Sequence, residues 1–316
     1  MPTDFTIPVA CVTEFLTTGV AVIPAVLSAE EVLQARQAFH SFLLMEGVDT
    51  SRLEETAGAL RGLSSTAGSG GVLDVFYESW QLALAENPRV FASLSQLWAA
   101  SFARDNCDAY RHPYGSFNPC NGYLYLDRLC FRVPDHVSAM HSFTVGKKQR
   151  PLQRSLTPHL DCCPHDLYAS SNRKWRPVQA FLALTDTLEK DQVRFESKIT
   201  SIGDNNSIIH FISLFMKGGF EACLGMHLEF DEWVRRRAAG SSSGSSPPCV
   251  GQFTPIRPVE DADVMSRMQH VPCRAGDLVC WDFRTPHANR CVIIHIPSLS
   301  SSPPLQWLFL YYIQSI

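Results

Sequence analysis

Hydrophobic positions in the first third of the chain predict one strand followed by helices. The segment 15–24, with its β-branched run 19–24 that stops at Pro24, predicts a buried strand. A helix is predicted next, because Ser28 and Glu31 have the spacing of a capping box. Apolar residues then recur at helical intervals up to Gly47, namely Val32, Ala35, Phe39 and Phe42. Residues 53–71 are rich in Ser, Gly and Ala and predict a loop, whereas 75–103 predict helices interrupted near Asn87 and Pro88.

The second half of the chain contains short runs that are typical of strands. Residues 121–133 alternate in part and predict either a pair of strands or one long bent strand. Residues 175–186 predict a core strand in which Gln179 and Phe181 face the same way. The runs 157–161 and 276–287 also predict strands, and the second ends on a histidine. The pattern therefore predicts a mainly β fold, a barrel-like sandwich with flanking helices.

Two of these strand-like runs supply candidate metal ligands. His159 and Asp161 are two residues apart, so on a strand both point into one cavity, while Leu160 points into apolar packing. His287, at the end of the run 276–287, offers a third ligand. Two histidines and one carboxylate form the facial triad that holds non-haem Fe(II) and leaves three positions open. A His-x-Asp tripeptide is also common without a metal, so its surroundings must support the assignment.

Composition and charge narrow the classes of function. The chain has 316 residues, 45% of them hydrophobic, which is enough for a large core in one large or two small domains, and we predict one. A net charge of -4 and a pI near 6.2 argue against a nucleic-acid-binding surface. The expected partner is a small molecule, and no membrane association is predicted, since the apolar stretch 307–316 is too short to span one. The oligomeric state is left open.

Cysteine usage favours a reduced, intracellular protein. The eleven cysteines are scattered and odd in number, and no secretory leader opens the chain, so free thiols and a cytoplasmic location are expected. Cys162, Cys163 and His165 could be imagined as zinc ligands, but no second pair of the Cys-x-x-Cys type completes a tetrahedral site.

Several blocks, in the right order, resemble the phytanoyl-CoA dioxygenase family of Fe(II)- and 2-oxoglutarate-dependent oxygenases. They are 19–42, Pro158–Asp161, 177–186, 218–227 and 276–287, and together they extend over most of the chain. The resemblance implies a double-stranded β-helix, a cupin-like jelly roll with the iron at its open end. It also implies His159, Asp161 and His287 as iron ligands, with 2-oxoglutarate as cosubstrate and O2 as oxidant. Asp161 points to hydroxylation, since halogenating relatives have a small residue in its place.

Cosubstrate binding is harder to assign from the sequence. The family anchors the distal carboxylate of 2-oxoglutarate with an arginine roughly ten residues beyond the second histidine, and this chain has none there. Arg290, Arg132 and Gln179 are our candidates for cosubstrate binding, and Arg128 is a further possible substitute. Arg128 and Arg132 share one face of a regular strand, where a surface ion pair is the alternative to lining the cavity. His227 resembles a family turn and is expected to be structural or to line the pocket.

Three segments depart from the family pattern. Residues 193–217 match no family block, and we interpret them as retained intron sequence, with a lineage-specific insertion as the alternative. Residues 240–248 are a Gly/Ser/Pro-rich flexible loop. Residues 291–316 form an atypical C-terminal tail, which a truncated or mis-spliced terminus would explain. Two functions therefore remain: a hydroxylase of a small organic substrate, or a non-catalytic or splice-defective member of the same fold.

Overall fold

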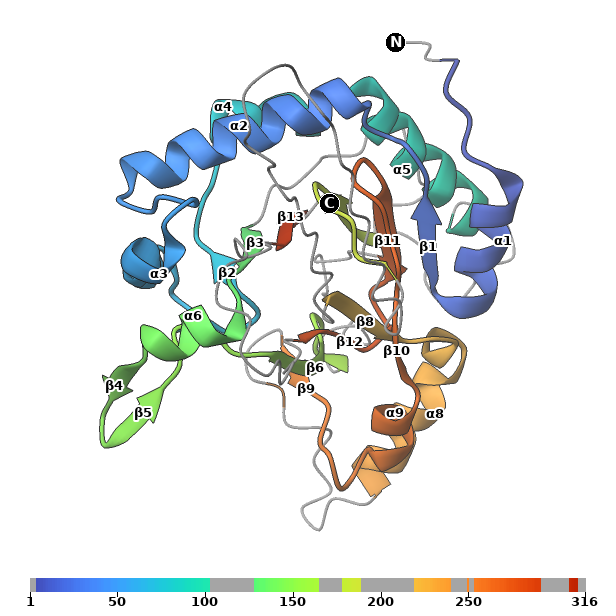
Figure 1. Ribbon diagram of the computed structural model, residues 1–316. Coiled ribbons are helices and arrows are strands. Elements are labelled where there is room, and N and C mark those ends of the chain that lie inside the picture. Colours follow the sequence, from blue (N-terminus) through green and yellow to red (C-terminus); the bar gives the residue numbers. More distant parts are fainter. Residues whose placement is uncertain are drawn as a thin grey trace.

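Two antiparallel sheets form the centre of the structure, a computed structural model that describes residues 4–102, 128–164, 178–188, 219–239, 249, 253–290 and 307–311 (Figure 1). The first sheet has the order β1-β11-β7-β13-β3-β2 and the second the order β10-β8-β12-β6-β9. Apart from the separate β4–β5 hairpin, the strands from β3 to β13 alternate between the two sheets in chain order, and β9 and β10 add edge strands to the second. Each sheet thus draws neighbouring strands from distant parts of the sequence.

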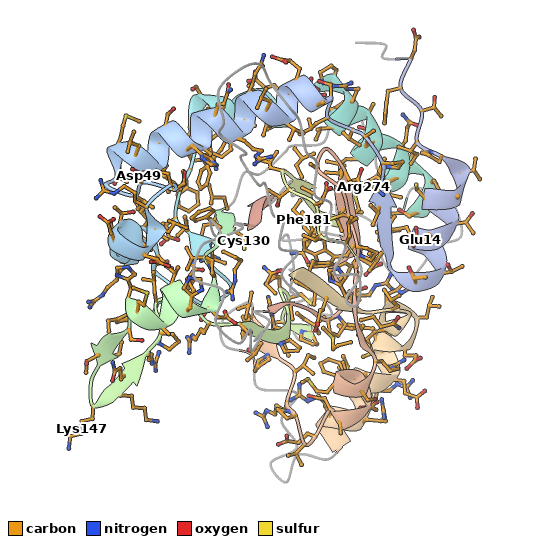
Figure 2. The ribbon with its side chains drawn as sticks, in the orientation of Figure 1. Glu14, Asp49, Cys130, Lys147, Phe181 and Arg274 are labelled. Carbon is orange, nitrogen blue, oxygen red and sulfur yellow. A yellow bond between two sulfur atoms is a disulfide. The ribbon has the colours of Figure 1, made fainter. Side chains whose placement is uncertain are left out.

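The strand boundaries follow from the strand-like runs. The first sheet contains β1 (Val20–Ile23), β2 (Val72–Leu73), β3 (Leu129–Arg132), β7 (Val178–Ala183), β11 (Leu278–Asp282) and β13 (Trp307–Tyr311). The second contains β6 (Leu156–Leu160), β8 (Gly219–Cys223), β9 (Thr254–Pro255), β10 (Met268–His270) and β12 (His287–Arg290). A separate hairpin, β4 (Phe143–Val145) with β5 (Lys148–Arg150), projects from the body, with Lys147 at its tip (Figure 2).

Helices cover the outer face of the first sheet. They are α1 (Val9–Thr18), α2 (Ala29–Met45), α3 (Leu53–Thr56), the 3-10 helix η1 (Ala57–Leu63), α4 (Ser79–Ala85), α5 (Pro88–Ser101) and α6 (Asp135–Met140). Alternate residues of β7 point to opposite faces of the sheet. Ala180 and Leu182 pack in the cluster shared with the helices, whereas Phe181 and Ala183 pack between the two sheets. Two more helices, α8 (Met226–Ala239) and α9 (Ala262–Ser266), lie against the outer face of the second sheet.

The core between the sheets is aromatic. Phe181 of β7, Phe220 of β8 and Trp281 of β11 are fully buried and contact one another, with ring centroids 4.8–6.0 Å apart. Burial of these three large rings removes much apolar surface from water and so helps to hold the two sheets together.

Several local predictions are confirmed. Ser28 caps α2 with a capping box, because its side chain accepts from the Glu31 N–H and Glu31 accepts from the Ser28 N–H. The break near residue 87 is real, since Asn87 caps α5 and Pro88 is its first residue. Strand β1 lies within the predicted 15–24.

Other local predictions were wrong. Residues 53–63, predicted as a loop from their composition, form α3 and η1, whose buried Leu53, Ala57 and Leu60 pack in the core. Phe15 belongs to α1 rather than to a strand, because Gly19 takes a left-handed conformation, φ 78°, and ends the helix there. The run 276–287 is two strands joined by a turn, so His287 begins β12 instead of ending the preceding strand.

Two of the three atypical segments, 193–217 and 240–248, lie outside the described residues. Part of the third is ordered into the sheet: β13 pairs with β7 on one side and β3 on the other. The tail 291–316 therefore supplies an inner strand of the first sheet. Among the described residues, none of the helices has the length and apolar character needed to cross a membrane.

Candidate metal centre

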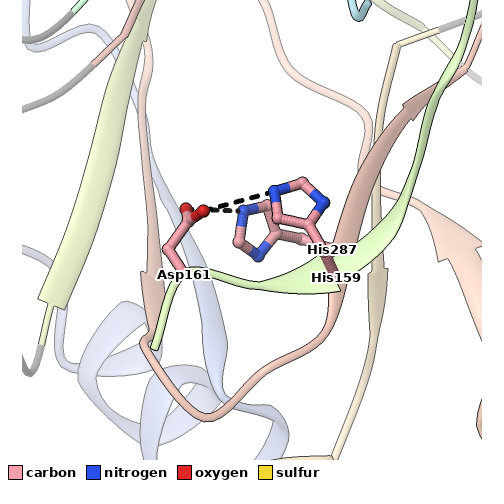
Figure 3. Close-up of side chains that lie close together, drawn as sticks. All are labelled: His159, Asp161 and His287. Carbon is pink, nitrogen blue, oxygen red and sulfur yellow. Dashed lines mark ion pairs between the residues drawn. The ribbon is translucent and has the colours of Figure 1, made fainter. Parts of the chain in front are cut away.

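His159, Asp161 and His287 meet at one point of the second sheet (Figure 3). His159 lies in β6 and His287 in β12, and these antiparallel strands place the two histidines directly opposite each other. Asp161 follows the end of β6 and turns its carboxylate toward both rings. Two segments far apart in the sequence are thus brought together by a single strand pairing.

The distances are compatible with a shared ion. Nε2 of His159 lies 3.3 Å from Oδ1 of Asp161, and Nε2 of His287 lies 3.2 Å from Oδ2. One nitrogen or oxygen from each residue lies within 4.8 Å of the other two. Donor atoms of one Fe(II) or similar ion, at bonds near 2 Å, are separated by roughly 3–4 Å, so small side-chain adjustments suffice. The two histidines are almost completely buried, and Asp161 keeps 23% of its side chain exposed.

Backbone hydrogen bonds orient both rings. Nδ1 of His159 lies 2.8 Å from the Thr157 carbonyl oxygen, and Nδ1 of His287 lies 3.1 Å from that of Thr285. Because a carbonyl oxygen only accepts, each Nδ1 carries a proton, so each ring, when it is neutral, presents the lone pair of Nε2 toward Asp161. Two lone pairs and a carboxylate that face one another at 3.2–3.3 Å repel unless a cation, either protons or a metal ion, lies among them. The donor set therefore fits a divalent metal.

The electrostatics of His287 and Asp161 favour the metal-binding forms of these two groups. Burial lowers the pKa of His287, and the charge of His159 lowers it further, against the opposing effect of Asp161. Burial alone would raise the pKa of Asp161, but the charge and hydrogen bond of His159, together with His287, hold that pKa well below its usual range. The lowered pKa values favour the neutral imidazole of His287 and the ionised carboxylate of Asp161, which are the protonation states that a metal requires.

A tight turn sets the position of His287. The Thr285 N–H donates to the Asp282 carbonyl oxygen at 2.8 Å, and the Asp282 side chain takes two hydrogen bonds from the Arg284 guanidinium at 2.7 and 2.5 Å. The Asp282 N–H also donates to the carbonyl oxygen of Gly19, at the start of β1. There is no room for a side chain at Gly19, because a Cβ would lie 2.6 Å from both His227 and Thr285. His227 therefore packs behind the turn, and its Nε2 lies 3.2 Å from the carbonyl oxygen of Leu16.

Aromatic rings support the two histidines. Phe253 stacks on His159 with ring centroids 4.7 Å apart and an interplanar angle of 26°. On the other side, Trp281 and Phe220 lie 5.0 and 5.8 Å from the His287 ring. Sequence reasoning missed Phe253, since a single phenylalanine four residues after Cys249, in a stretch with little hydrophobic pattern, carries no signal of its own.

The candidates for cosubstrate binding have different surroundings. Gln179, in β7, donates from Nε2 to Oδ2 of Asp161 at 3.0 Å, so it belongs to the centre. Arg132 is buried in β3 and donates to the Arg154 carbonyl oxygen at 2.8 Å, while Arg128 lies 3.9 Å from Asp74, as expected for an ion pair near the surface. The backbone of Arg290 pairs with Gly219, and its side chain lies outside the described part of the chain. Strand β13, 307–311, contains no arginine.

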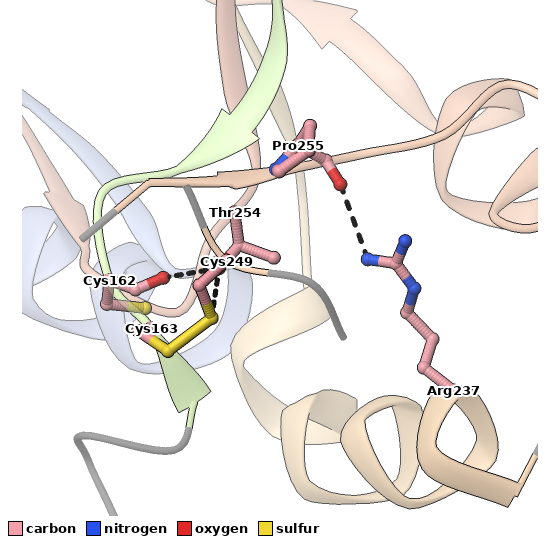
Figure 4. The surroundings of a disulfide bond; sticks show 6 residues. All are labelled: Cys162, Cys163, Arg237, Cys249, Thr254 and Pro255. Atoms are coloured by element: carbon pink, nitrogen blue, oxygen red, sulfur yellow. Dashed lines mark hydrogen bonds between the residues drawn. A yellow bond between two sulfur atoms is a disulfide. The ribbon is translucent and has the colours of Figure 1, made fainter. Parts of the chain in front are cut away.

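The expectation that all cysteines are free thiols was wrong for one pair. Cys163 and Cys249 form a disulfide, with Cα atoms 5.7 Å apart (Figure 4). Cys163 is therefore not available as a ligand of the zinc site considered from the sequence. Cys162 is buried, with its Sγ toward the Phe283 carbonyl oxygen, and His165 lies outside the described residues. The pairing could not be read from an odd, scattered set of cysteines, because it depends on the strand pairing of β6 with β9.

Comparisons with known proteins support the fold. No family model and no curated protein matches the sequence. The chain is similar to the structure of a protein of Salmonella typhimurium LT2 that is provisionally described as an oxidoreductase, at 15% identity and a TM-score of 0.60, over 97% of this chain and 70% of that one.

Two further structures illustrate the range of similarity. GlcNAc Inducible Gene 2 (GIG2, DUF1479) from Candida albicans has 12% identity and a TM-score of 0.61, over 99% of this chain and 64% of that one. The epimerase SnoN, solved with Fe3+, alpha ketoglutarate and nogalamycin RO, has 16% identity and a TM-score of 0.48, over 96% of this chain and 82% of that one. At these identities the first two likenesses show the fold alone, and the third, with its TM-score below 0.5, adds no argument.

Proposed function

We propose that this protein is an Fe(II)- and 2-oxoglutarate-dependent dioxygenase that hydroxylates a small organic substrate, as the resemblance to the phytanoyl-CoA dioxygenase family suggests. The observation that carries the proposal is the meeting of His159, Asp161 and His287, two buried imidazoles and a carboxylate with their donor atoms within 4.8 Å. Two nitrogens and one oxygen on one side of an ion are the donor set of non-haem Fe(II) oxygenases.

The arrangement of strands supports the same proposal. Two antiparallel sheets whose strands alternate along the chain are what a double-stranded β-helix of a single domain would have, and the paired metal ligands lie on two adjacent strands of one sheet. The likeness to a provisionally described oxidoreductase is consistent with this reading.

The residues of the chain would divide the work as follows. His159, Asp161 and His287 would hold the iron, which, when bound with 2-oxoglutarate and O2, supplies oxidative chemistry at an otherwise unreactive C–H bond. The carbonyl groups of Thr157 and Thr285 fix the orientation of the imidazoles. Phe253, Trp281 and Phe220 exclude water from the sides of the two rings. The presence of a carboxylate at Asp161 favours hydroxylation over halogenation.

An anaerobic titration tests this proposal. Fe(II) is added to the purified protein, then 2-oxoglutarate, and the visible metal-to-ligand charge-transfer band is followed. We expect a band that is lost in His159→Ala and retained in His136→Ala, since His136 is an exposed histidine paired with Glu54. A protein that binds Fe(II) without ever developing the band would contradict a 2-oxoglutarate-dependent activity.

That outcome would favour a second candidate, a non-catalytic member of the fold that binds metal but not cosubstrate. The observation in its favour is the sequence of β13, Trp-Leu-Phe-Leu-Tyr, which offers no guanidinium to a cosubstrate carboxylate. A carboxylate buried without a cationic or multiply hydrogen-bonding partner is costly. Arg132 and Arg290 remain the proposed substitutes, and their replacement by Met, singly and together, would show whether either one holds the cosubstrate.

A further inference from the structure

We propose that Gln179 is a positioning residue that fixes the carboxylate of Asp161 for metal binding. The inference rests on the proposed metal site and adds a role within it. Gln179 occupies the inward-facing row of β7, in which Phe181 and Ala183 are the following members and pack between the two sheets. Gln179 lies at the end of this apolar row with 1% of its surface exposed, and the burial of a side-chain amide is costly unless its polar atoms make hydrogen bonds.

The hydrogen bond of Gln179 accounts for its placement. Its Nε2 donates to Oδ2 of Asp161 at 3.0 Å, from a strand of the opposite sheet. Asp161 lies beyond the end of β6, so the ladder of that strand does not hold its side chain. The amide of Gln179 therefore adds, from the opposite sheet, a restraint on the rotation of a carboxylate that also lies 3.2–3.3 Å from both imidazoles, and a restrained ligand loses less entropy when an ion binds.

The bond also bears on how the carboxylate would bind. A carboxylate can offer one oxygen or both to a metal ion, and a facial triad keeps three positions open only if it offers one. Gln179 donates to Oδ2, which also lies 3.2 Å from Nε2 of His287, whereas Oδ1 lies 3.3 Å from Nε2 of His159 and receives no bond from Gln179. Oδ1 would therefore be the oxygen that keeps the most freedom to bind a metal ion. The backbone of Gln179 is itself held by the partner strand, where Trp281 is its direct opposite.

The test compares Gln179→Met with Gln81→Met, using Co(II) alone as the probe. Met has nearly the length of Gln but no donor. Gln81 is a matched control, because it is also fully buried and its Nε2 donates at 3.0 Å, to the carbonyl oxygen of Val75 in the helical region. We expect the dissociation constant for Co(II) to rise about 10- to 100-fold in Gln179→Met and to stay within about twofold of wild type in Gln81→Met. The visible spectrum of the bound Co(II) should change in Gln179→Met only.

Gln179→Asn serves as a second variant if Gln179→Met does not fold. Asn keeps the donor but is one methylene shorter, so it should also weaken Co(II) binding. Wild-type affinity and an unchanged Co(II) spectrum in a folded Gln179 variant would overturn the positioning role and leave the metal site standing. Absence of Co(II) binding in the wild-type protein would instead overturn the metal site, and with it the inference about Gln179.

Discussion

His159 and His287 face each other across the paired strands β6 and β12, with ring centroids 4.5 Å apart, and Asp161 lies within 3.3 Å of both rings. The register of one strand pair thus creates the centre. A slip of one residue would turn one histidine to the opposite face of the sheet. The contacts that fix this register, including the turn before His287, are therefore as important to the site as the ligands.

The disulfide should stabilise the region around β6. Cys163 and Cys249 are 86 residues apart in sequence, and a cross-link over a loop of that size restricts the unfolded chain. Replacement of both by Ser should lower the free energy of unfolding by about 2–4 kcal/mol, measured by urea denaturation under non-reducing conditions. Peptide mapping should recover the linked pair from the unreduced protein. Recovery of both cysteines as free thiols would contradict the pairing.

The buried thiols should be unreactive in the folded protein. Burial raises the pKa of Cys130 and of Cys273 to about 12, and that of Cys223 to about 11. Since the thiolate is the reactive form, iodoacetamide at pH 8 should leave these three unmodified until denaturant is added. Mass spectrometry of peptides from native and unfolded samples checks this. Rapid labelling of Cys130 in the native state would mean that the interior of the first sheet is open to solvent.

A buried ion pair connects α8 to the loop before α9. Nε of Arg237 lies 3.4 Å from Oδ1 of Asp261, and this oxygen also accepts a hydrogen bond from the Trp233 indole at 2.9 Å. In addition, Nη1 of Arg237 donates to the carbonyl oxygen of Pro255 in β9 (Figure 4). Removal of one partner leaves the other charge buried, so Arg237→Met should lower the free energy of unfolding by about 3–5 kcal/mol. The exposed pair Arg52 and Glu55 is the control, because Arg52→Met should leave the urea midpoint nearly unchanged. Equal effects of the two substitutions would contradict this account.

His227 should make stability depend on pH. Burial lowers the pKa of His227 and is the largest effect on it. The charge of Asp282 and the hydrogen bond with Leu16 oppose this shift, whereas the charge of Arg284 adds to it. The unfolded chain, with an ordinary pKa of about 6.5, then binds the proton more readily than the folded one. The contribution of the neutral His227 to the free energy of unfolding is thus fully present above about pH 6.5. It is lost as the pH falls from there to the lowered pKa of His227 in the folded protein.

The comparison of wild type with His227→Gln isolates this contribution. Urea midpoints measured at pH 7.5 and 5.5 should differ less in the variant than in wild type, because Gln can keep a bond to Leu16 without titrating. The same difference between the two pH values in both proteins would show that His227 is not the group responsible.

The sequence predicted the elements whose signals are local. The capping box of Ser28 and Glu31 and the proline that opens α5 act within a few residues, so they could be placed without knowledge of the fold. That Gln179 and Phe181 share one face of their strand followed from strand periodicity alone, whereas the structure shows that this face is the inner one.

The features that the sequence did not reveal depend on contacts between distant segments. Leu53 and Leu60 are helical because of the core against which they pack, although Ser, Gly and Ala around them favour a loop. The contact of Gln179 with Asp161, the stacking of Phe253 on His159 and the pairing of Cys163 with Cys249 all arise from the assembled sheets. The spacing of His159 and Asp161 indicated a site, whereas its supporting residues required the structure.

Calorimetric titration with Co(II) tests the central claim most directly, because it asks only whether His159, Asp161 and His287 bind one metal ion. Wild type should bind one Co(II) per chain, and His287→Ala should bind more than about 100-fold more weakly, since a ligand matters at least as much as the residues that support it. His136→Ala should behave as wild type. Undiminished, stoichiometric binding by His287→Ala, or no binding by the wild-type chain, would contradict the account.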